Sequence, residues 1–462
     1  MEFFDYIASL KSKKIAVIGA GVSNMPLIEL LREKACDVTV CDKRTAEEMG
    51  DLYGKLVEIG AQLHMGTDYL EGLDAFDLIF RTPGLLPLNE HLQFAASKGV
   101  EITSEMEVFF KLCPCKTIAI TGSDGKTTTS SVIAELLRAS GKTVHLGGNI
   151  GRPLLCDIPA MAAEDICVLE LSSFQLHSMK CKPDVAVVTN VSPNHLDVHP
   201  DYEDYIDAKK SVYKLQDRTC RLVVNGDNEI TNGFGDEALS TVYRFSRRKM
   251  PEHGAYYADG KIFFNDGSAV KEIIDIDEIK IPGMHNVENY MAAYCATQGM
   301  VDDETFREVA RTFSGVAHRL ELIRELNGVK YINDSIASSP TRAIAGLRSF
   351  KPTDSLVLIV GGHDKNIPFD ELGDEICQRC KALFICGETA EKISAAVCNS
   401  RYYTRDFPMF INEDWKENVL AASRFAQPGD TVLLSPACSS FDFFKNFAER
   451  GNLFRNIVME LN

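Results

Sequence analysis

Short apolar runs alternate with amphipathic stretches along almost the whole chain. Three of these runs, at residues 14–19, 117–121 and 355–361, have the pattern of buried strands, and each leads into a glycine-rich or polar loop. Strands that alternate with helices form largely parallel sheets in α/β domains, and ligands gather where such strands end. The pattern therefore predicts an α/β protein in which each of these strands heads its own domain.

The pattern is interrupted at two places between these strands. Cys113-Pro114-Cys115 ends an apolar helix, and residues 314–317 follow a helical stretch around Phe306. A chain of 462 residues is long enough for about three domains, because one domain averages roughly 150 residues. We therefore expect domains at residues 1–112, 113–315 and 316–462.

Composition and charge restrict the class of partner. The net charge of −17 argues against nucleic acid, because binding to a phosphate backbone needs a basic face. No apolar run approaches the roughly 20 residues of a membrane span, so we expect no membrane insertion. Residues 1–14 lack the pattern of a secretory signal, and the chain has fourteen cysteines. We expect a cytoplasmic protein with reduced, mostly buried thiols, including Cys377 and Cys380.

Residues 121–129 read Thr-Gly-Ser-Asp-Gly-Lys-Thr-Thr-Thr and connect a predicted strand to a helix expected at residues 130–139. Glycines let backbone amides approach a polyphosphate, and a helix N-terminus adds partial positive charge. Lys126 would reach the β- and γ-phosphates of ATP, and the Thr127 hydroxyl would bind Mg²⁺. The strict motif has a glycine where this chain has Ile120. The loop still predicts ATP binding, by Gly122, Ser123, Asp124, Gly125, Lys126, Thr127 and Thr128.

Two later strands lead to residues suited to phosphoryl transfer. Glu170 interrupts an apolar run, and an acid at a strand end can hold or orient Mg²⁺. His195 follows the strand predicted at residues 184–190, at the mouth of a parallel sheet, where ligands gather. Lys209 lies in a helical stretch and by itself indicates only a surface lysine.

Taken together, these motifs resemble the Mur ligase family, which also resembles folylpolyglutamate synthetase. The match covers essentially the whole chain, with Asp124 where the family usually has Asn. The other matching motifs follow in the family order: Gly148-Asn149-Ile150-Gly151, Glu170-Leu171-Ser172-Ser173, Asn194-His195-Leu196-Asp197, Gly283-Met284-His285-Asn286-Val287-Glu288-Asn289 and His318-Arg319-Leu320-Glu321. The resemblance implies a Rossmann-like first domain, a P-loop ATPase-like central domain and a Rossmann-like third domain.

The resemblance also implies roles for single residues around ATP. Lys126, Glu170, His195 and Lys209 would be catalytic, and Thr127, Glu170, His195 and Lys209 would hold two Mg²⁺ ions. Lys209 would act as a carbamate formed with CO₂, which requires the neutral amine that burial favours. The remaining ATP-binding residues would be Asn286 and Asn289 near the adenine, Arg319 near the phosphates, and Asp334, which would help close the third domain on ATP.

The loop at residues 19–24 imitates a dinucleotide fingerprint, but Asn24 replaces its third glycine, which weakens an NAD site. It resembles instead the UDP-binding loop of the D-glutamate-adding branch of the family. Ser23 and Asn24 would lie at the diphosphate, and Asp42 and Arg44 near the uracil. The residues that the resemblance assigns to the UDP substrate are Gly21, Val22, Ser23, Asn24, Asp42, Arg44, Thr82, Pro83, Gly84 and Asn149.

The segment at residues 434–451 is closely similar to the same branch. Lys365 could hold one carboxylate of D-glutamate as a point charge, and Ser435 with the amides up to Phe444 could hold the other. Ile336 departs from the pattern, because many relatives have Lys after the Asp334-Ser335 pair. We expect Arg342 to compensate for the missing charge.

The resemblance implies an ATP-dependent amide ligase that acts as a monomer and joins D-glutamate to UDP-N-acetylmuramoyl-L-alanine. The substrate carboxylate would be activated as an acyl phosphate, with release of ADP and phosphate, in peptidoglycan precursor synthesis. Three alternatives stay open: another Mur or folylpolyglutamate-type ligase, a nucleotide-gated regulator without catalysis, and an NAD-dependent dehydrogenase. The last has no use for the loop at Lys126.

Overall fold

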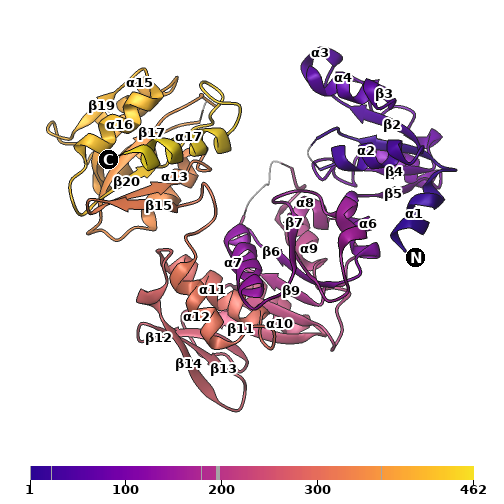
Figure 1. The fold of residues 1–462 in the computed structure, drawn as a ribbon, viewed down its shortest axis with the longest axis horizontal. Coiled ribbons are helices and arrows are strands. Elements are labelled where there is room, and N and C mark those ends of the chain that lie inside the picture. Colours follow the sequence, from indigo (N-terminus) through magenta and orange to yellow (C-terminus); the bar gives the residue numbers. More distant parts are fainter. Residues whose placement is uncertain (1, 22, 178, 194–197, 366, 462) are drawn as a thin grey trace. The chain divides into compact units, whose positions relative to one another are not determined.

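A computed structural model describes residues 2–21, 23–177, 179–193, 198–365 and 367–461. The chain forms three β-sheets whose strands alternate with helices along the chain, which confirms the predicted α/β fold class (Figure 1). By its internal contacts it separates into two compact units, Met1–Ile276 with Glu288–Val309, and Asp277–Val287 with Ala310–Asn462. No helix among the described residues has both the length and the apolar content to cross a membrane. The domain boundaries after residues 112 and 315 stay predictions.

The first sheet has five parallel strands in the order β3-β2-β1-β4-β5. Its side chains alternate between the two faces: Ile15 and Val17 of β1 join one apolar cluster, and Ala16 and Ile18 join another. The strands are β1 (Lys14–Ile18), β2 (Asp37–Asp42), β3 (Gln62–Met65), β4 (Leu78–Phe80) and β5 (Glu101–Thr103). The helices are α1 (Phe3–Leu10), α2 (Met25–Glu33), α3 (Ala46–Met49), α4 (Asp51–Glu58), α5 (Glu90–Ser97) and α6 (Glu105–Leu112).

The second sheet has nine strands in the order β14-β13-β12-β11-β10-β9-β6-β8-β7. The strands from β12 to β7 in this order run parallel, whereas β12, β13 and β14 pair in an antiparallel arrangement. The strands are β6 (Lys116–Thr121), β7 (Val144–Gly148), β8 (Ile166–Glu170), β9 (Val185–Val188), β10 (Arg221–Asn225), β11 (Thr241–Ser246), β12 (Gly254–Ala258), β13 (Lys261–Asn265) and β14 (Val270–Asp275). The α-helices between β6 and β15 in the chain are α7 (Lys126–Ala139), α8 (Ser173–Leu176), α9 (Tyr202–Lys210), α10 (Glu229–Glu237), α11 (Met284–Ala296) and α12 (Asp303–Thr312).

The third sheet has six strands in the order β15-β16-β20-β17-β18-β19, parallel except for the β15–β16 pair. Leu358 and Ile359 of β17 face opposite apolar clusters, so helices cover both faces. The strands are β15 (Glu321–Leu326), β16 (Val329–Asn333), β17 (Ser355–Val360), β18 (Cys380–Ile385), β19 (Met409–Ile411) and β20 (Asp430–Leu434). The helices are α13 (Pro340–Arg348), α14 (Asp370–Arg379), α15 (Ala390–Cys398), α16 (Trp415–Phe425) and α17 (Phe447–Glu460).

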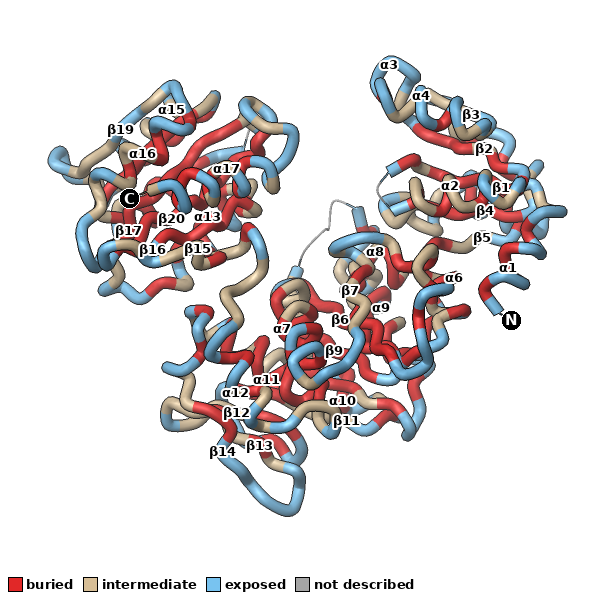
Figure 2. The backbone as a smooth tube through the Cα atoms, viewed as in Figure 1, coloured by how far each residue is buried: buried red, intermediate tan, exposed pale blue. Residues whose placement is uncertain are grey.

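The three predicted leading strands are β1, β6 and β17, and all are buried (Figure 2). In the first two sheets, successive strands lie first on one side of the leading strand and then on the other. The change of side falls between β1 and β4 in the first sheet and between β6 and β9 in the second. Ligands of parallel sheets bind at such switch points, outside the carboxyl ends of the strands. The fold therefore brings the loops after β1, β4, β6, β8 and β9 to the places where binding sites are expected.

Candidate active site

The loop after β6 owes its shape to two glycines. Gly122 has a φ of +147°, and a Cβ atom there would lie 1.9 Å from the Thr189 hydroxyl oxygen. Gly125 has a φ of +80°, and its Cβ would lie 2.6 Å from the Asn289 side-chain oxygen. Both positions therefore require glycine. The helix begins at Lys126, not at residue 130 as predicted, because left-handed Gly125 serves as its N-cap.

Two lysines converge on one carbonyl of this loop. Lys126 Nζ donates to the oxygen of Gly122 at 2.8 Å and to that of Ser123 at 3.0 Å. Lys209 Nζ, from α9, donates to the same Gly122 oxygen at 2.9 Å and lies over the ring of Tyr205. Lys209 is 1% exposed. Burial, and then the charge of Lys126, lower the pKa of Lys209 well below its usual value, against the opposing effect of Asp124. Lys209 is thus a buried amine at the phosphate loop.

Glu170 ends β8, as predicted, and points into the same end of the sheet. One of its carboxylate oxygens accepts from the side-chain amide of Asn149 at 2.8 Å. The other is buried and has no hydrogen-bond partner among the described residues. Gly148 makes the approach of Asn149 possible, because a Cβ there would lie 2.2 Å from the Glu170 backbone oxygen. A buried carboxylate oxygen without a donor is a suitable ligand for a hard cation such as Mg²⁺.

Further side chains fasten this loop, among them Thr189 and Tyr205, which the sequence did not single out. The Ser123 hydroxyl bonds to the Tyr205 hydroxyl at 2.9 Å and receives the backbone amide of Ser192 at 2.9 Å. Thr189 donates to the Asp124 carbonyl oxygen. The Thr129 hydroxyl donates to the side-chain oxygen of Asn289 at 3.1 Å, so Asn289 contacts the first turn of α7; its place near the adenine stays a prediction. Threonine and tyrosine carry no local signal for such roles, which depend on the packing of β9 and α9 against β6.

A buried histidine network joins α8 to α9. His199 is 2% exposed and bonds to Asp204 at 2.6 Å and to the Ser173 hydroxyl at 2.9 Å. His177 bonds to the same carboxylate at 2.8 Å. Burial opposes ionisation of Asp204, but the two histidines lower its pKa. His195, the predicted metal ligand and catalytic residue, lies outside the described residues, as does Val22.

The loop after β1 has a different polar content. Asn24 is 1% exposed, and its amide donates to the carbonyl oxygens of Ile18 at 2.9 Å and Gly19 at 3.1 Å. Asp42, at the end of β2, accepts from the Ala20 amide at 2.9 Å and pairs through both oxygens with Arg44. Burial of Asp42 opposes ionisation, but these hydrogen bonds hold its pKa at about 2.

A small cavity lies next to this loop. Its lining includes the predicted residues Ser23, Asn24 and Pro83 together with Arg81 and Glu105. The loop after β4 also approaches Gly19, whose Cβ would lie 3.3 Å from the Thr82 Cβ. Burial raises the pKa of Glu105 to about 7. The fold thus brings Ser23, Asn24 and Pro83 together, with Gly21 and Gly84 exposed in their loops. Arg81 and Glu105 were missed, since buried charged residues look like surface residues in sequence.

In the second unit, Asp334 and Ser435 form a buried pair. The Ser435 hydroxyl donates to Asp334 at 2.9 Å, and the Leu320 amide donates to the other oxygen at 3.3 Å. Burial raises the pKa of Asp334 to about 7, although Ser435 and the charges of Arg319 and Arg342 lower it. Ile336, in place of the family's lysine, is half-buried. The charge of Arg342 therefore acts on the Asp334 carboxylate, close in the chain to Ile336, where many relatives have a lysine.

The other predicted residues of this unit are separate from that pair. Lys365 is exposed and donates to the Ser338 carbonyl at 3.4 Å, and the Phe444 ring packs edge-on against Trp415. The Asn286 amide donates to the Pro282 carbonyl at 2.6 Å. Arg450 was missed: it is 1% exposed and donates to the Ser335 hydroxyl at 3.0 Å and the Cys438 carbonyl at 3.1 Å. It holds the loop at residues 435–440 to the end of β16.

Comparison with known proteins decides the family. Three family models match in succession: "Mur ligase MurD-like, N-terminal domain" at residues 13–104, "Mur ligase middle domain" at residues 120–297, and "Mur ligase, glutamate ligase domain" at residues 318–438. The chain is 48% identical to the UDP-N-acetylmuramoylalanine--D-glutamate ligase of Acetivibrio thermocellus, over 98% of both chains. This chain belongs to the Mur ligase family. It is also 45% identical to the enzyme of that name from Clostridium novyi, over 100% of this chain and 99% of the relative.

Solved structures of Mur ligase type share the fold. The UDP-N-acetylmuramate-alanine ligase of Thermotoga maritima aligns with a TM-score of 0.59 and 16% identity, over 97% of this chain and 99% of that one. E. coli FolC, solved with DHPP and ADP, aligns with a TM-score of 0.55 and 16% identity, over 77% of this chain and 91% of that one. At these identities the likeness concerns the fold alone. The Mur ligases are ATP-dependent enzymes, and the phosphate loop of this chain fits that family.

Proposed function

We propose that this Mur ligase joins D-glutamate to UDP-N-acetylmuramoyl-L-alanine, with conversion of ATP to ADP and phosphate. The observation that carries the proposal is the 48% identity, over 98% of both chains, to a relative named UDP-N-acetylmuramoylalanine--D-glutamate ligase. The grouping of Lys126, Lys209 and Glu170 at one end of the central sheet supports ATP-dependent chemistry. The protein acts in the cytoplasm as a monomer, in the synthesis of peptidoglycan precursors.

The reaction begins with a carboxylate that must be activated before an amine can attack it. The terminal carboxylate of the UDP substrate attacks the γ-phosphate of ATP, which gives an acyl phosphate and ADP. Both partners are anions, and Lys126 at the phosphate loop offsets their repulsion and stabilises the transferring group. The amine of D-glutamate then attacks the acyl carbon, and phosphate leaves. Closure of the third domain through Asp334 keeps water from the acyl phosphate.

The described residues fit a magnesium site at the phosphate loop. Glu170 has a buried oxygen without a donor among the described residues, and the Thr127 hydroxyl is on the first turn of α7. Together with His195 and Lys209 they would hold two Mg²⁺ ions, which supply positive charge that the two lysines alone do not provide. Lys209 suits a carbamate, because its depressed pKa favours the neutral amine that captures CO₂.

The proposed substrate contacts lie in the loops of the first unit and in the second unit. The residues proposed to bind the UDP moiety are Gly21, Val22, Ser23, Asn24, Asp42, Arg44, Thr82, Pro83, Gly84 and Asn149. Asn286, Asn289 and Arg319 contact ATP. Lys365, Ser435 and the backbone near Phe444 hold the two carboxylates of D-glutamate, and Arg342 supplies the charge that Ile336 does not.

The test is phosphate release by the purified protein with ATP, Mg²⁺ and UDP-N-acetylmuramoyl-L-alanine. Parallel reactions contain D-glutamate, L-glutamate, meso-diaminopimelate or no amino acid. We expect release with D-glutamate alone, together with the amide product by mass spectrometry. Release with another amino acid would contradict the proposed substrate while keeping the ligase chemistry. ATP binding without turnover in every mixture would favour the nucleotide-gated regulator instead.

A further inference from the structure

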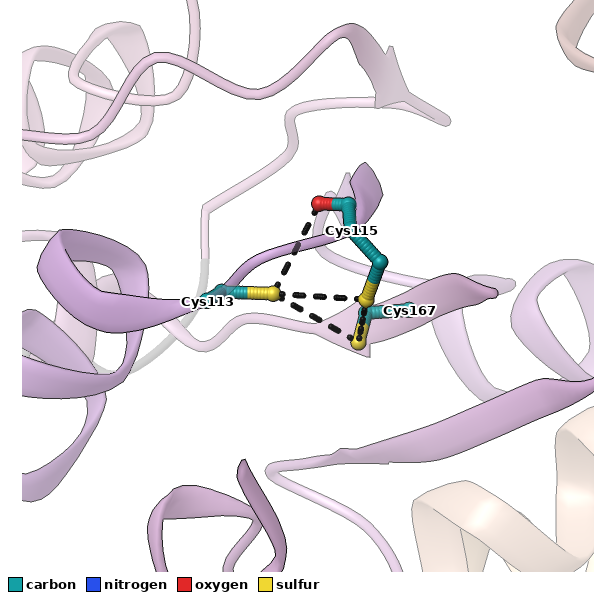
Figure 3. Close-up of side chains that lie close together, drawn as sticks. All are labelled: Cys113, Cys115 and Cys167. Carbon is teal, nitrogen blue, oxygen red and sulfur yellow. Dashed lines mark hydrogen bonds between the residues drawn. The ribbon is translucent and has the colours of Figure 1, made fainter. Parts of the chain in front are cut away.

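Three cysteine side chains from different parts of the first unit converge on one point. Cys113 follows α6, Cys115 precedes β6, and Cys167 lies in the buried strand β8. Figure 3 shows their sulfur atoms pointing toward one another. The Sγ–Sγ distances are 3.6 Å between Cys113 and Cys115, 3.7 Å between Cys113 and Cys167, and 3.2 Å between Cys115 and Cys167. This triangle is one of two groups among the described residues with metal-ligand geometry.

The chain holds these thiols in place by local structure. Pro114 separates Cys113 from Cys115 and fixes its own φ, and Cys113 has the extended conformation (φ −59°, ψ 124°) that a residue before proline favours. Cys167 is fixed by the register of β8, where it pairs with Thr117 of β6 and His145 of β7. The site is thus built before any ligand binds, which lowers the ordering cost of binding.

The surroundings suit a thiophilic cation. Cys115 and Cys167 are 8% and 0% exposed, whereas Cys113 is half-buried and gives access from solvent. The thioether sulfur of Met161 lies 3.8 Å from the Cys167 sulfur. Metal ions bind cysteine as the thiolate, so binding at this site would release the thiol protons.

We propose that Cys113, Cys115 and Cys167 form a binding site for a thiophilic d¹⁰ cation, Zn²⁺ or Cu⁺, separate from the magnesium site of the ligase. A Zn–S bond of about 2.3 Å places tetrahedral thiolate sulfurs about 3.8 Å apart, so two of the three distances already match. A disulfide would need a sulfur pair at about 2 Å and would leave one thiol unpaired. Soft thiolate and thioether ligands select Zn²⁺ and Cu⁺ over Mg²⁺. The ion fastens the peptide between α6 and β6 to strand β8.

Cys377 and Cys380 provide a contrast within the same chain. Their spacing is typical of zinc or redox motifs, yet the Cys377 thiol contacts the Val397 carbonyl oxygen. They do not belong to either group with metal-ligand geometry among the described residues. Spacing alone would have selected this pair, whereas convergence in space selects the triangle.

The experiment uses the full-length protein, stripped of metal under reducing conditions. Zn²⁺ and Cu⁺ are titrated separately in competition with a chromophoric chelator, and Co²⁺ is added as a spectroscopic probe for thiolate ligands. Protection of each cysteine from alkylation is mapped by mass spectrometry in the wild-type protein, so the result does not depend on a variant that folds. Exposed Cys398 is the internal control, because it should react equally with and without metal.

We expect one tight equivalent of Zn²⁺ or Cu⁺, a sulfur-to-cobalt charge-transfer band, and metal-dependent protection of Cys113, the half-buried thiol of the three. Cys113→Ser should weaken binding by about a hundredfold or more, since loss of even an outer-shell partner costs 10–100-fold. Cys398→Ser should bind as the wild type does. Absence of the charge-transfer band, equal alkylation of all cysteines with metal, or a disulfide in the protein as isolated would each overturn the proposal.

Discussion

Two glycine-containing loops of the first unit have the same topological position but different chemistry. Each follows the leading strand of a parallel sheet, β1 or β6, beside the switch point. The loop after β1 surrounds a buried amide, Asn24, and lies beside the ion pair of Asp42 and Arg44. The loop after β6 directs Lys126 and Lys209 at a single carbonyl oxygen. Position in the fold therefore indicates where a ligand binds, and the side chains determine what happens to it.

The difference follows from what each site must do to its ligand. A bound nucleotide that does not react needs hydrogen bonds and shape, which a buried amide and backbone groups provide. A site where two anions react needs excess positive charge, which Lys126 would supply at the phosphate loop. The cost of bringing two lysines close together at the β6 loop shows in the pKa of Lys209, which burial and the charge of Lys126 lower well below its usual value.

The largest effect that separates the two loops is expected at Lys126. Lys126→Ala should lower kcat about a thousandfold, because losing one preorganised group that stabilises developing charge costs about 10²–10³. Binding of the UDP substrate, measured calorimetrically without ATP, should stay unchanged. Exposed Lys142→Ala serves as the control. Weakened UDP-substrate binding in the Lys126 variant would mean that the two loops do not act separately.

Lys209 should show the next largest effect and a dependence on CO₂. Lys209→Met should lower kcat about a hundredfold, and removal of bicarbonate should slow the wild type and Lys210→Met but not Lys209→Met. Lys210 is the neighbouring control, because it pairs with Glu237 at the surface. If wild-type activity is independent of bicarbonate and mass spectrometry finds no CO₂ added to Lys209, the proposed carbamate is wrong.

The depressed pKa of Lys209 also predicts a pH dependence of stability. The unfolded chain binds a proton at Lys209 below about pH 10.4, whereas the folded chain binds it only at lower pH. The free energy of unfolding should therefore rise with pH below that value, relative to Lys209→Met. Denaturant unfolding at pH 7 and pH 9 measures this difference, and equal slopes for both proteins would contradict the burial of a neutral amine.

The two loops should also differ in their tolerance of a methyl group. Gly122→Ala should destabilise the protein by about 1–3 kcal/mol, the cost of a strained backbone position, and should weaken ATP binding, because the new Cβ meets Thr189. Gly21→Ala should be nearly neutral, since nothing lies within 4 Å of its Cβ position. Thermal unfolding and ATP titration of both variants check this pair. Equal losses in the two variants would contradict the geometry of one of the two loops.

Local patterns were sufficient to predict the fold class and the loops, because both depend on short apolar runs and glycine spacing. The start of α7 was predicted four residues too late: a run of threonines favours extended backbone, but Gly125 caps the helix at Lys126. The burial of Lys209 could not be derived from its neighbours in sequence. It depends on the packing of α9 against the phosphate loop, and only the family resemblance indicated it.

Residues that act through tertiary contacts were missed for the same reason. Tyr205 and Thr189 reach the phosphate loop from α9 and β9, and Arg450 reaches Ser335 from α17. Each is an ordinary residue type in an ordinary element. Their partners are distant in sequence, so no spacing rule could connect them. Sequence motifs therefore indicate where a glycine-rich loop lies better than they indicate which distant side chains hold that loop in place.

The smallest predicted effect belongs to the β1 loop. Asn24→Ala removes the amide that donates to the carbonyl oxygens of Ile18 and Gly19, and a buried hydrogen bond contributes about 1 kcal/mol, with about 1.4 kcal/mol per tenfold change in binding. The KM for the UDP substrate should rise roughly 25-fold, because two such bonds are lost, while the KM for ATP stays constant. Ser97→Ala is the control, since Ser97 donates only within its own helix, to Phe94. A rise in the KM for ATP, or a loss of kcat with unchanged KM, would show that Asn24 serves the reacting phosphates, and the contrast between a binding loop and a reacting loop would then fail.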